Sequence, residues 1–411
     1  MTRRQHAIVI LILGTLTTIS PFSIDMYLPG FPAIAKSLHT TIDQVQLSLT
    51  AYLIGISFGQ ILYGPLLDRY GRKLPLYGGL VLYLVASVGC ALTNSIETLI
   101  LMRLLQALGG CVGLVAAQAL VRDLFPVSKI AQVFSLLTLV VAVSPMIAPT
   151  IGGYATVAMG WHSIFLILAG ITALIIIAIY FVLPDGKKPD PSLSLRPRAV
   201  VSNYLTVMKQ PQFLTYSLVA GIATSAPFAY IAGSPDVFMN IYHLSEQQYG
   251  WIFAFLSIAI IAPSQLNHIL LKRFQSEQII FTTLVLQSIV GILMLAGTWA
   301  GWFGPYGLIA VLFVFLLGQS LTGPNASALS LAPFTRHAGS AAALMGSFRM
   351  GFGALVSASV SIFHNRTAIP MVGMMTLCVV TGLVGLLLGQ RVIHYRTKKA
   401  AVNEPLSEVA L

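Results

Sequence analysis

The chain has 411 residues, of which 56% are hydrophobic and only 9% are charged, whereas charged residues make up roughly a quarter of a soluble domain. This composition excludes a soluble globular protein. The net charge of +11 would favour a nucleic-acid partner in a soluble protein, but in a membrane protein the position of each basic residue along the chain matters more than their sum.

Long stretches without charged residues predict twelve membrane-spanning helices, because a bilayer crossing needs about 20 apolar residues. The stretches 130–184 and 278–335 are too long for one helix and have Gly and Trp residues midway, so each is interpreted as two spans joined by a tight turn. The predicted spans are 8–30, 45–67, 73–93, 96–120, 130–154, 161–183, 212–239, 247–271, 277–299, 304–330, 338–363 and 368–391. The predicted fold class is an all-α membrane protein.

The basic residues fix the expected orientation of these spans. With a cytoplasmic N-terminus, 19 of the 23 Lys and Arg residues lie in segments on the inner side. Only Lys36 and Arg366 lie in outer loops, and Arg103 and Arg349 fall within spans. The positive-inside rule therefore predicts a multi-pass membrane protein with both termini in the cytoplasm, and it makes nucleic-acid binding the poorer interpretation. No cleavage site follows the first apolar run, which favours a retained helix over a signal peptide.

The first span contains Asp25, in the sequence IDMYLP at 24–29. A carboxyl group within a hydrophobic span is a functional-site hypothesis, because desolvation favours its neutral form and lets a proton gradient control its charge. The alternative is an Asp at the outer end of the helix that simply reaches water. Arg103 of the fourth span lies within roughly 3 Å of Asp25 in predicted depth, so the two are expected to pair or compete during proton coupling.

The loop after the second span reads GPLLDRYGRK at 64–73. A glycine such as Gly64 permits close helix approach, Asp68 can pair with basic groups at the helix end, and Gly71 permits the turn before Arg72. An ordinary arginine-rich loop would explain the basic residues but not the Asp and the two glycines. Together with Asp123 at the end of the fourth span, the predicted cytoplasmic gate consists of Gly64, Asp68, Arg69, Gly71, Arg72 and Asp123.

The fourth and fifth spans carry small residues at helix-packing positions. Arg103 and Gln106 share a helical face with Gly110, Gly113 and Ala117, so that a polar head is followed by residues that admit a close neighbour. The fifth span ends in SPMIAPTIGG at 144–153, where Pro145, Pro149, Gly152 and Gly153 predict a flexible, closely packed helix. The alternative for this segment is a generic kinked packing helix.

The polar stretch 184–211 contains five prolines and divides the spans six and six. The predicted organisation is a six-helix bundle at 1–184, a cytoplasmic basic linker at 185–211, a second bundle at 212–395 and a cytoplasmic tail at 396–411. Two equal bundles are typical of a transporter whose substrate path runs between its halves near the midplane.

A substrate cavity between the halves is expected to include residues with hydrogen-bonding side chains. The candidates are Tyr27, Tyr52, Gln118, Tyr230, Asn325 and Arg349. Arg349 shares one side of the eleventh span with Gly346, Gly353 and Ser357, and we expect these small residues to let it lean into the cavity. Two arginines within spans, against Asp25 and an Asp236 near the outer end of the seventh span, favour neutral drugs over dications.

Several motifs are absent from the sequence. It has no phosphate-binding loop of the kind that would indicate ATP as the energy source, and no His-Glu-x-x-His motif or intramembrane acidic cluster. Cys90, Cys111 and Cys378 are scattered through predicted spans, which favours packing roles over a disulfide framework. We therefore expect no metal and no cofactor, with the proton gradient as the energy source.

These motifs together resemble one family. The loop 64–73 is similar to the signature loop of the major facilitator superfamily, LMRLLQALGG at 101–110 to its fourth-helix motif, and 144–153 to its antiporter motif, with Ser144 and Ala148 in place of glycines. Together with the context of Asp25, LVRD at 120–123 and SFRMGFGA at 347–354, they are similar to the bicyclomycin and chloramphenicol resistance subgroup of drug/proton antiporters.

The resemblance implies two pseudo-symmetric six-helix bundles and a monomer that exports small, mostly neutral antibiotics or other drugs in exchange for protons. Many members carry an Arg where Gln118 stands, and an apolar residue is usual where Asp236 stands. Two alternatives stay open. One is a proton symporter or uniporter that imports a small polar nutrient on the same fold, and the other is a polytopic membrane enzyme.

Overall fold

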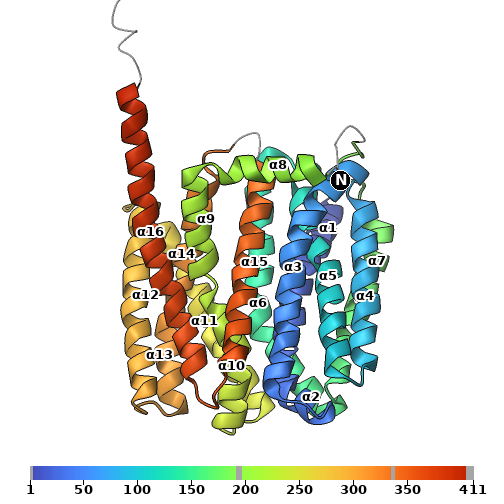
Figure 1. The fold of residues 1–411 in the computed structure, drawn as a ribbon. Coiled ribbons are helices and arrows are strands. Elements are labelled where there is room, and N and C mark those ends of the chain that lie inside the picture. The colour runs from blue at the N-terminus through green and yellow to red at the C-terminus, as the bar shows by residue number, and fades with distance from the viewer. Residues whose placement is uncertain (1–2, 191–196, 335–337, 404–411) are drawn as a thin grey trace, which may run out of the picture.

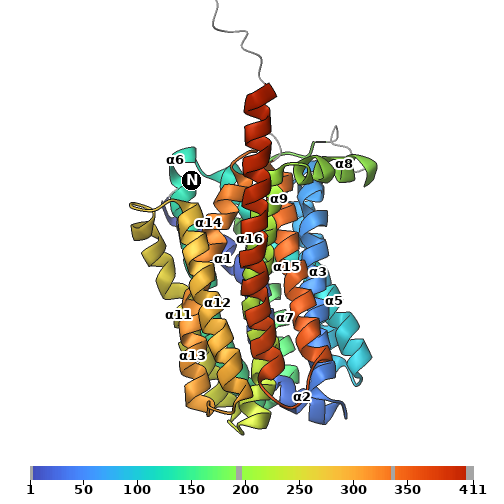
Figure 2. The ribbon, with the colours of Figure 1, turned by 60° about the vertical axis from the view of Figure 1, so that its left-hand side comes forward.

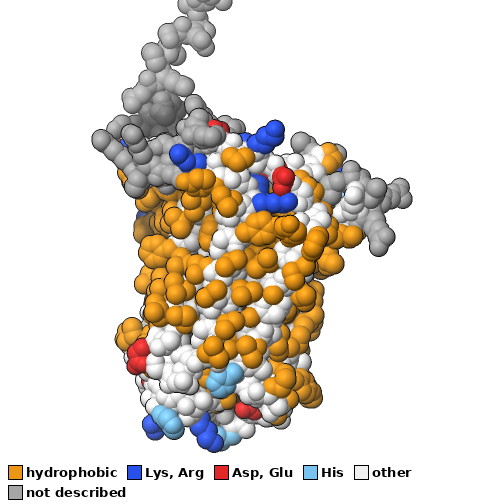
Figure 3. All heavy atoms as spheres, turned by 90° about the vertical axis from the view of Figure 1, so that its right-hand side faces the viewer, with side chains coloured by type: hydrophobic (Ala, Val, Ile, Leu, Met, Phe, Trp, Pro, Cys, Tyr) orange, Lys and Arg blue, Asp and Glu red, His pale blue; other side chains and the backbone are white. Residues whose placement is uncertain are grey.

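The computed structural model describes residues 3–190, 197–334 and 338–403. Within these residues twelve helices are long and apolar enough to cross a membrane, which confirms the predicted all-α fold class. Apolar side chains cover the flank of the molecule, and charged side chains gather at its two ends (Figure 3). Since a bilayer core favours an apolar surface and internally paired backbone groups, this is a multi-pass membrane protein.

The first half of the chain forms six spans. They are α1 (Arg3–Asp25) with its extension η1 (Leu28–Gly30) and α2 (Phe31–Ser37), then α3 (Ile42–Tyr70), α4 (Lys73–Leu92), α5 (Ile96–Leu124), α6 (Val127–Met159) and α7 (His162–Val182). The α-helical part of the first span ends at Asp25 rather than at residue 30, and the chain continues through a short 3-10 turn. Pro29 lies in that turn, since a proline cannot donate the backbone hydrogen bond that an α-helix needs.

The second half repeats this arrangement with two interrupted spans. Its elements are α9 (Pro211–Ala223), α10 (Ala226–Pro235) and η2 (Asp236–Ile241), then α11 (Glu246–Leu270), α12 (Ser276–Trp299), α13 (Pro305–Leu317), α14 (Gln319–Leu331), α15 (Ala338–Ile362) and α16 (Ile369–Asn403). Pro227 lies at the start of α10, after the break in the seventh span. At the break in the tenth span, the amide of Gln287 donates to the carbonyl of Phe315 at 3.0 Å.

The linker and the C-terminal segment contain more helix than expected. α8 (Pro197–Met208) lies within the predicted linker 185–211 and runs across one end of the bundle (Figure 1). α16 extends beyond the bundle, so the first residues of the predicted tail 396–411 are helical, and residues 404–411 lie outside the described part of the chain (Figure 2). The boundaries of the two bundles stay predictions.

The two ends of the bundle differ in how the halves meet. We call the end that carries α8 and the N-terminus the linker end, and the opposite end, which carries α2, the far end (Figure 1). α3 packs along α15, and α6 packs along α11, so each half contributes two helices to the junction. Thr50 on α3 and Ser357 on α15 share a hydrogen bond of 2.9 Å between their hydroxyl oxygens. This junction positions the site described next.

Candidate functional site

A cavity of about 800 Å³ lies between the halves and extends to the linker end. Its walls come from α3, α5 and α6 of the first half and from α9, α14 and α15 of the second half, and α8 contributes Asn203 and Tyr204. This volume falls within the range of roughly 300 to 1,000 Å³ that is usual for small-molecule sites. The cavity can therefore hold a compound of drug size.

Three long polar side chains on the cavity wall have no polar partner in the described part of the chain. They are Gln60 on α3, Gln118 on α5 and Arg349 on α15. Among the residues that the structure describes, none of the three has a hydrogen bond or an ion pair. Because polar groups near an apolar environment are stabilised by partners, these three are available to a ligand.

The small residues beside Arg349 admit neighbours from other helices. A Cβ added to Gly346 would collide with the amide of Gln60, and one added to Gly353 would lie 2.7 Å from the ring of Phe228. Ser357 is bonded to Thr50. Gln60 of α3 and Phe228 of α10 therefore occupy the space beside two of these small residues. Arg349 and Gly346 both line the cavity, and the expectation that the small residues give Arg349 room to lean into it stays a prediction.

Arg103 is fully buried within the first half and lies outside this cavity wall. Its Nη1 donates to Gln106 Oε1 at 2.7 Å, and Gln106 Nε2 donates to Ser87 Oγ at 2.7 Å. Its guanidinium carbon lies 4.1 Å from the ring centre of Tyr52 and 4.5 Å from that of Tyr27. These are cation–π contacts, so the two tyrosines predicted for the cavity surround Arg103 instead.

Asp25 is 4% exposed at the end of α1. The structure has no ion pair between Asp25 and Arg103, and no hydrogen bond to the carboxyl group of Asp25 among the described residues. Its electrostatic neighbours include Tyr230 and Tyr249 of the second half. The turn that follows it packs against α6, α10 and α11. Asp25 therefore lies where the two halves meet.

Two other predicted cavity residues hold the second half together. Tyr230 on α10 is buried and stacks on Phe253 of α11, with 5.3 Å between ring centres. Asn325 on α14 donates to Asn267 Oδ1 at 2.7 Å and accepts from Ser276 Oγ at 2.9 Å. Neither lies on the cavity wall, so of the six predicted cavity residues only Gln118 and Arg349 do.

Three of the predicted gate residues, Asp68, Arg72 and Asp123, meet at the linker end. Arg72 bonds to Asp68 Oδ1 at 2.8 Å and to Asp123 Oδ2 at 2.7 Å, and the backbone N–H of Lys187 donates to Asp123 at 2.9 Å. Burial opposes the charge of Arg72, but the bonds and charges of Asp123 and Asp68 outweigh it and raise the pKa of its guanidinium. Gly71 has a φ of 79° in the turn before Arg72.

These gate contacts lie within the first half and the start of the linker, and they coexist with an open cavity. Gly64 lines the cavity, and a Cβ there would meet nothing within 4 Å, so the expected close helix approach is absent. The guanidinium carbon of Arg69 lies 5.9 Å from the ring centre of Tyr70. The network braces one half, and its role in closing this end stays a prediction.

The glycines of the fifth span make close contacts at the far end. A Cβ on Gly152 would collide with the backbone of Met26, and one on Gly153 would lie 2.8 Å from the backbone oxygen of Glu246 on α11. The helix α6 continues through Pro145 and Pro149 without a break. These glycines therefore allow backbone contact, and at Gly153 this contact joins the two halves.

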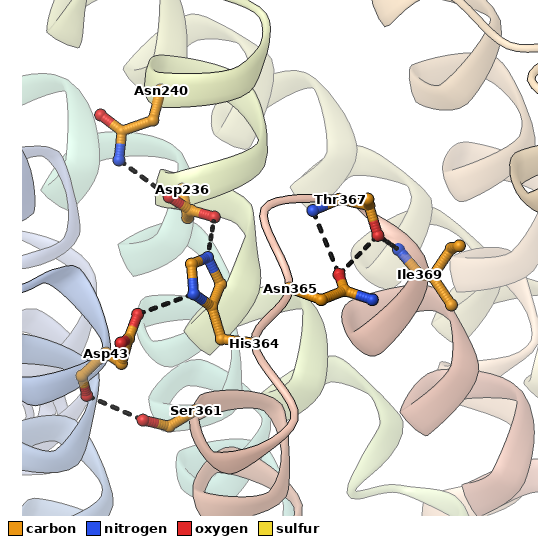
Figure 4. A network of polar contacts seen from close by, with 8 residues as sticks. All are labelled: Asp43, Asp236, Asn240, Ser361, His364, Asn365, Thr367 and Ile369. Carbon is orange, nitrogen blue, oxygen red and sulfur yellow. Dashed lines mark hydrogen bonds and ion pairs between the residues drawn. The ribbon is translucent and has the colours of Figure 1, made fainter.

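One cluster at the far end was missed by sequence reasoning. His364 lies between Asp43 and Asp236, which come from different halves (Figure 4). The sequence places Asp43 and His364 at the outer ends of spans, where each reads as an ordinary solvated residue. The one signal in the sequence was that three titratable residues lie at the outer ends of predicted spans, and that one of them, Asp236, stands where an apolar residue is usual.

Comparison with known proteins gives consistent relatives. A family model described as Major Facilitator Superfamily matches residues 13–358. The "Bicyclomycin resistance protein homolog" of Haemophilus influenzae is 32% identical over 93% of this chain and 96% of that protein. The "Chloramphenicol resistance protein" of Pseudomonas aeruginosa is 30% identical over 68% of this chain and 65% of that protein. "Multidrug resistance protein D" of Escherichia coli is 27% identical over 99% of this chain and 100% of that protein.

A solved structure shares the fold. It is a bacterial homolog of the human lysosomal transporter Spinster, which was crystallised in an inward-facing, unoccupied conformation. The TM-score is 0.69 at 14% identity, and the match covers 95% of this chain and 96% of that one. At this identity the likeness concerns the fold alone.

Proposed function

The chain belongs to the major facilitator superfamily, and from this premise we propose that it is a drug exporter that exchanges protons for small, mostly neutral antibiotics or other drugs. The linker end faces the cytoplasm of the bacterial inner membrane, with both termini on that side, because most basic residues lie in the segments at that end. The chain acts as a monomer, since one copy supplies both walls of the cavity.

The observation that carries this proposal is the cavity with its three unpartnered polar side chains. An inward-open cavity collects drug from the cytoplasm or the inner leaflet, and alternating access then releases it outside. Gln60, Gln118 and Arg349 together offer both donors and acceptors to a bound molecule. A ligand that bonds to all three is held by both halves at once, so binding can favour the conformational change.

The charges on the cavity wall favour neutral substrates. Among the residues that the structure describes, the charged side chains that line it are Asp68, Arg72, Arg122, Asp123 and Arg349, which sum to +1. Arg72 is already neutralised by the two carboxylates, whereas Arg349 has no partner. A dication would lose its hydration without gaining a free carboxylate, which makes its binding unfavourable. Neutral antibiotics with carbonyl or hydroxyl groups fit better.

Asp25 is proposed as the proton-coupling residue. Its carboxyl group is buried at the junction of the halves without a cation to balance its charge. Ionising this carboxyl group in the present conformation therefore costs desolvation free energy that no neighbouring cation offsets. Its ionisation is for this reason linked to the arrangement of the halves. Arg103 is held by its own partners and does not compensate Asp25 here.

Everted membrane vesicles test this proposal. Vesicles that carry the protein are energised with respiration, and a neutral antibiotic of the bicyclomycin or phenicol type is added while the internal pH is recorded. An antiporter that takes the drug into the vesicle must release protons from it. Vesicles with Asp25→Asn are the control for coupling. If the wild type moves the drug without moving protons, or moves neither, the proposal is wrong.

A further inference from the structure

His364 joins the two halves of the protein at the far end through two carboxylates (Figure 4). Its Nδ1 lies 2.9 Å from Asp43 Oδ1, and its Nε2 lies 2.8 Å from Asp236 Oδ2. Asp43 is in the first turn of α3 in the first half, Asp236 begins η2 in the second half, and His364 is in the loop after α15. We call these three residues the histidine bridge.

Neighbouring groups hold the histidine bridge in place. Asn240 donates to the second oxygen of Asp236 at 2.8 Å, and the hydroxyl of Ser361 donates to the backbone carbonyl of Asp43 at 2.7 Å. In the loop itself, Asn365 Oδ1 accepts from the backbone N–H of Thr367 at 3.2 Å and from its hydroxyl at 2.6 Å. The loop is therefore internally bonded and presents His364 between its partners.

The chemistry of the histidine bridge requires a proton. A neutral imidazole has one N–H donor and one acceptor nitrogen, whereas an ionised carboxylate only accepts. Both contacts of His364 can be hydrogen bonds only if both ring nitrogens carry hydrogen, or if one carboxyl group is protonated. Without that proton, a nitrogen lone pair would face a carboxylate oxygen at less than 3 Å. In the arrangement that the structure shows, the histidine bridge therefore holds one proton more than a neutral imidazole between two ionised carboxylates.

We propose that Asp43, His364 and Asp236 form a second proton-binding site, separate from Asp25, and that the bound proton holds the far end closed. The His364 side chain is 21% exposed, so solvent at the far end supplies the proton. When the halves separate at this end, His364 loses at least one carboxylate, because its partners lie in different halves. The closed state therefore binds the proton more tightly than the open state, and alkaline pH favours opening.

The other charged and titratable groups around the histidine bridge do not replace its members. They are Lys36 on α2, His39 before α3, Arg366 in the loop of His364, and His243 and Glu246 beyond η2. Among the described residues, none of these forms an ion pair with Asp43, Asp236 or His364. Among the described residues, no group of three or more His, Cys, Asp or Glu side chains is arranged to hold a metal ion.

The role in transport rests on the proposed function, which places the far end outside the cell. External protons would then favour closure of the outer end after the drug has left, which returns the protein to its inward-open form. The Thr50 and Ser357 hydroxyls, bonded at 2.9 Å, are buried in the same junction between α3 and α15. Proton binding at this site thus favours the change from the outward-open to the inward-open form.

Spin-label distance measurements test the proposal without any substrate. Labels on Asn94→Cys in the α4–α5 turn and Trp302→Cys in the α12–α13 turn report the separation of the halves at the far end, and the native Cys90, Cys111 and Cys378 are buried. In purified protein we expect the closed-to-open ratio to fall at least about threefold between about pH 6 and about pH 8. The ceiling is about tenfold per pH unit for one proton.

His364→Gln keeps a hydrogen-bonding side chain but removes the ionisable ring, so its closed-to-open ratio should depend clearly less on pH than that of the wild type, and the remaining dependence comes from Asp25. His39→Asn is the matched control, because His39 is an exposed histidine at the same end with a φ of 51°, which Asn tolerates, and it should behave as the wild type. If His364→Gln does not fold, Asp43→Asn replaces it and should also reduce the pH response. A wild type whose distances ignore pH, or a His364→Gln variant that responds fully, would overturn the proposal.

These outcomes are separable from those of the proposed function. A protein that exports no drug in vesicles can still show the pH-dependent distances, which would support the second proton site and count against the exporter. A protein that exports neutral drugs but shows no pH response at the far end would support the exporter and overturn the second proton site.

Discussion

Arg349 and Arg103 are both arginines within membrane spans, but the structure predicts opposite consequences of replacing them. Arg349 faces the cavity without a partner among the described residues. Arg103 is fully buried and is bonded to Gln106 and stacked on Tyr27 and Tyr52. Methionine is the matched substitution for both, because it keeps an unbranched apolar stem and removes every donor.

For Arg349→Met, we expect loss of drug binding with little loss of stability. A hydrogen bond that involves a charged group contributes about 1.5 to 3 kcal/mol. Since about 1.4 kcal/mol is a factor of ten, the affinity for a neutral antibiotic should fall roughly tenfold to a hundredfold. Thermal unfolding in detergent should be close to that of the wild type, because no contact within the protein is removed.

For Arg103→Met, the expected pattern is reversed. The substitution leaves the buried Gln106 amide without its charged partner and removes three cation–π contacts, with Tyr27, Tyr52 and Phe165, each of which contributes about 0.5 to 2 kcal/mol. Unfolding should therefore occur at a clearly lower temperature, and the affinity of the folded fraction should change little. Isothermal titration with the antibiotic and thermal unfolding on the same samples separate the two cases. If Arg349→Met is as destabilised as Arg103→Met and still binds the drug fully, the assignment of Arg349 to the substrate cavity is refuted.

Three further predictions follow from the same contacts. Asp25→Asn should abolish uphill drug export while keeping drug binding, and vesicle transport assays that show undiminished uphill export would contradict the coupling role. Asp123→Asn should lower thermal stability more than Asp68→Asn, because the side chain of Asp123 is 15% exposed and that of Asp68 is 49% exposed. The expected loss of folding free energy is about 1.5 to 3 kcal/mol for Asp123→Asn and less than about 1 kcal/mol for Asp68→Asn. Equal shifts in unfolding temperature would be inconsistent with this reasoning. Gly153→Val should collide with the facing backbone and shift the far end toward opening in spin-label distances, whereas Gly170→Val, where a Cβ meets nothing within 4 Å, should not.

The sequence alone determined the membrane fold and several local contacts. Hydropathy identifies the spans because a chain in lipid must pair its backbone groups within each helix, so span length and apolar composition are fixed locally. The contacts of Arg72 with Asp68 and Asp123 were also accessible, because helix ends that share one side of the membrane lie near each other. Gln118 and Arg349 were found because a polar side chain in a span generally avoids lipid.

Only the tertiary structure decided which polar groups meet. Similar depth suggested that Asp25 and Arg103 pair, but depth does not give the direction in which each helix face points, and Arg103 faces Tyr27 and Tyr52 inside its own half. His364 belongs to a contact between segments that are distant in sequence and lie in different bundles. Helix rotation and the packing of the two halves determine these contacts, and both depend on side chains along the whole junction rather than on any local pattern.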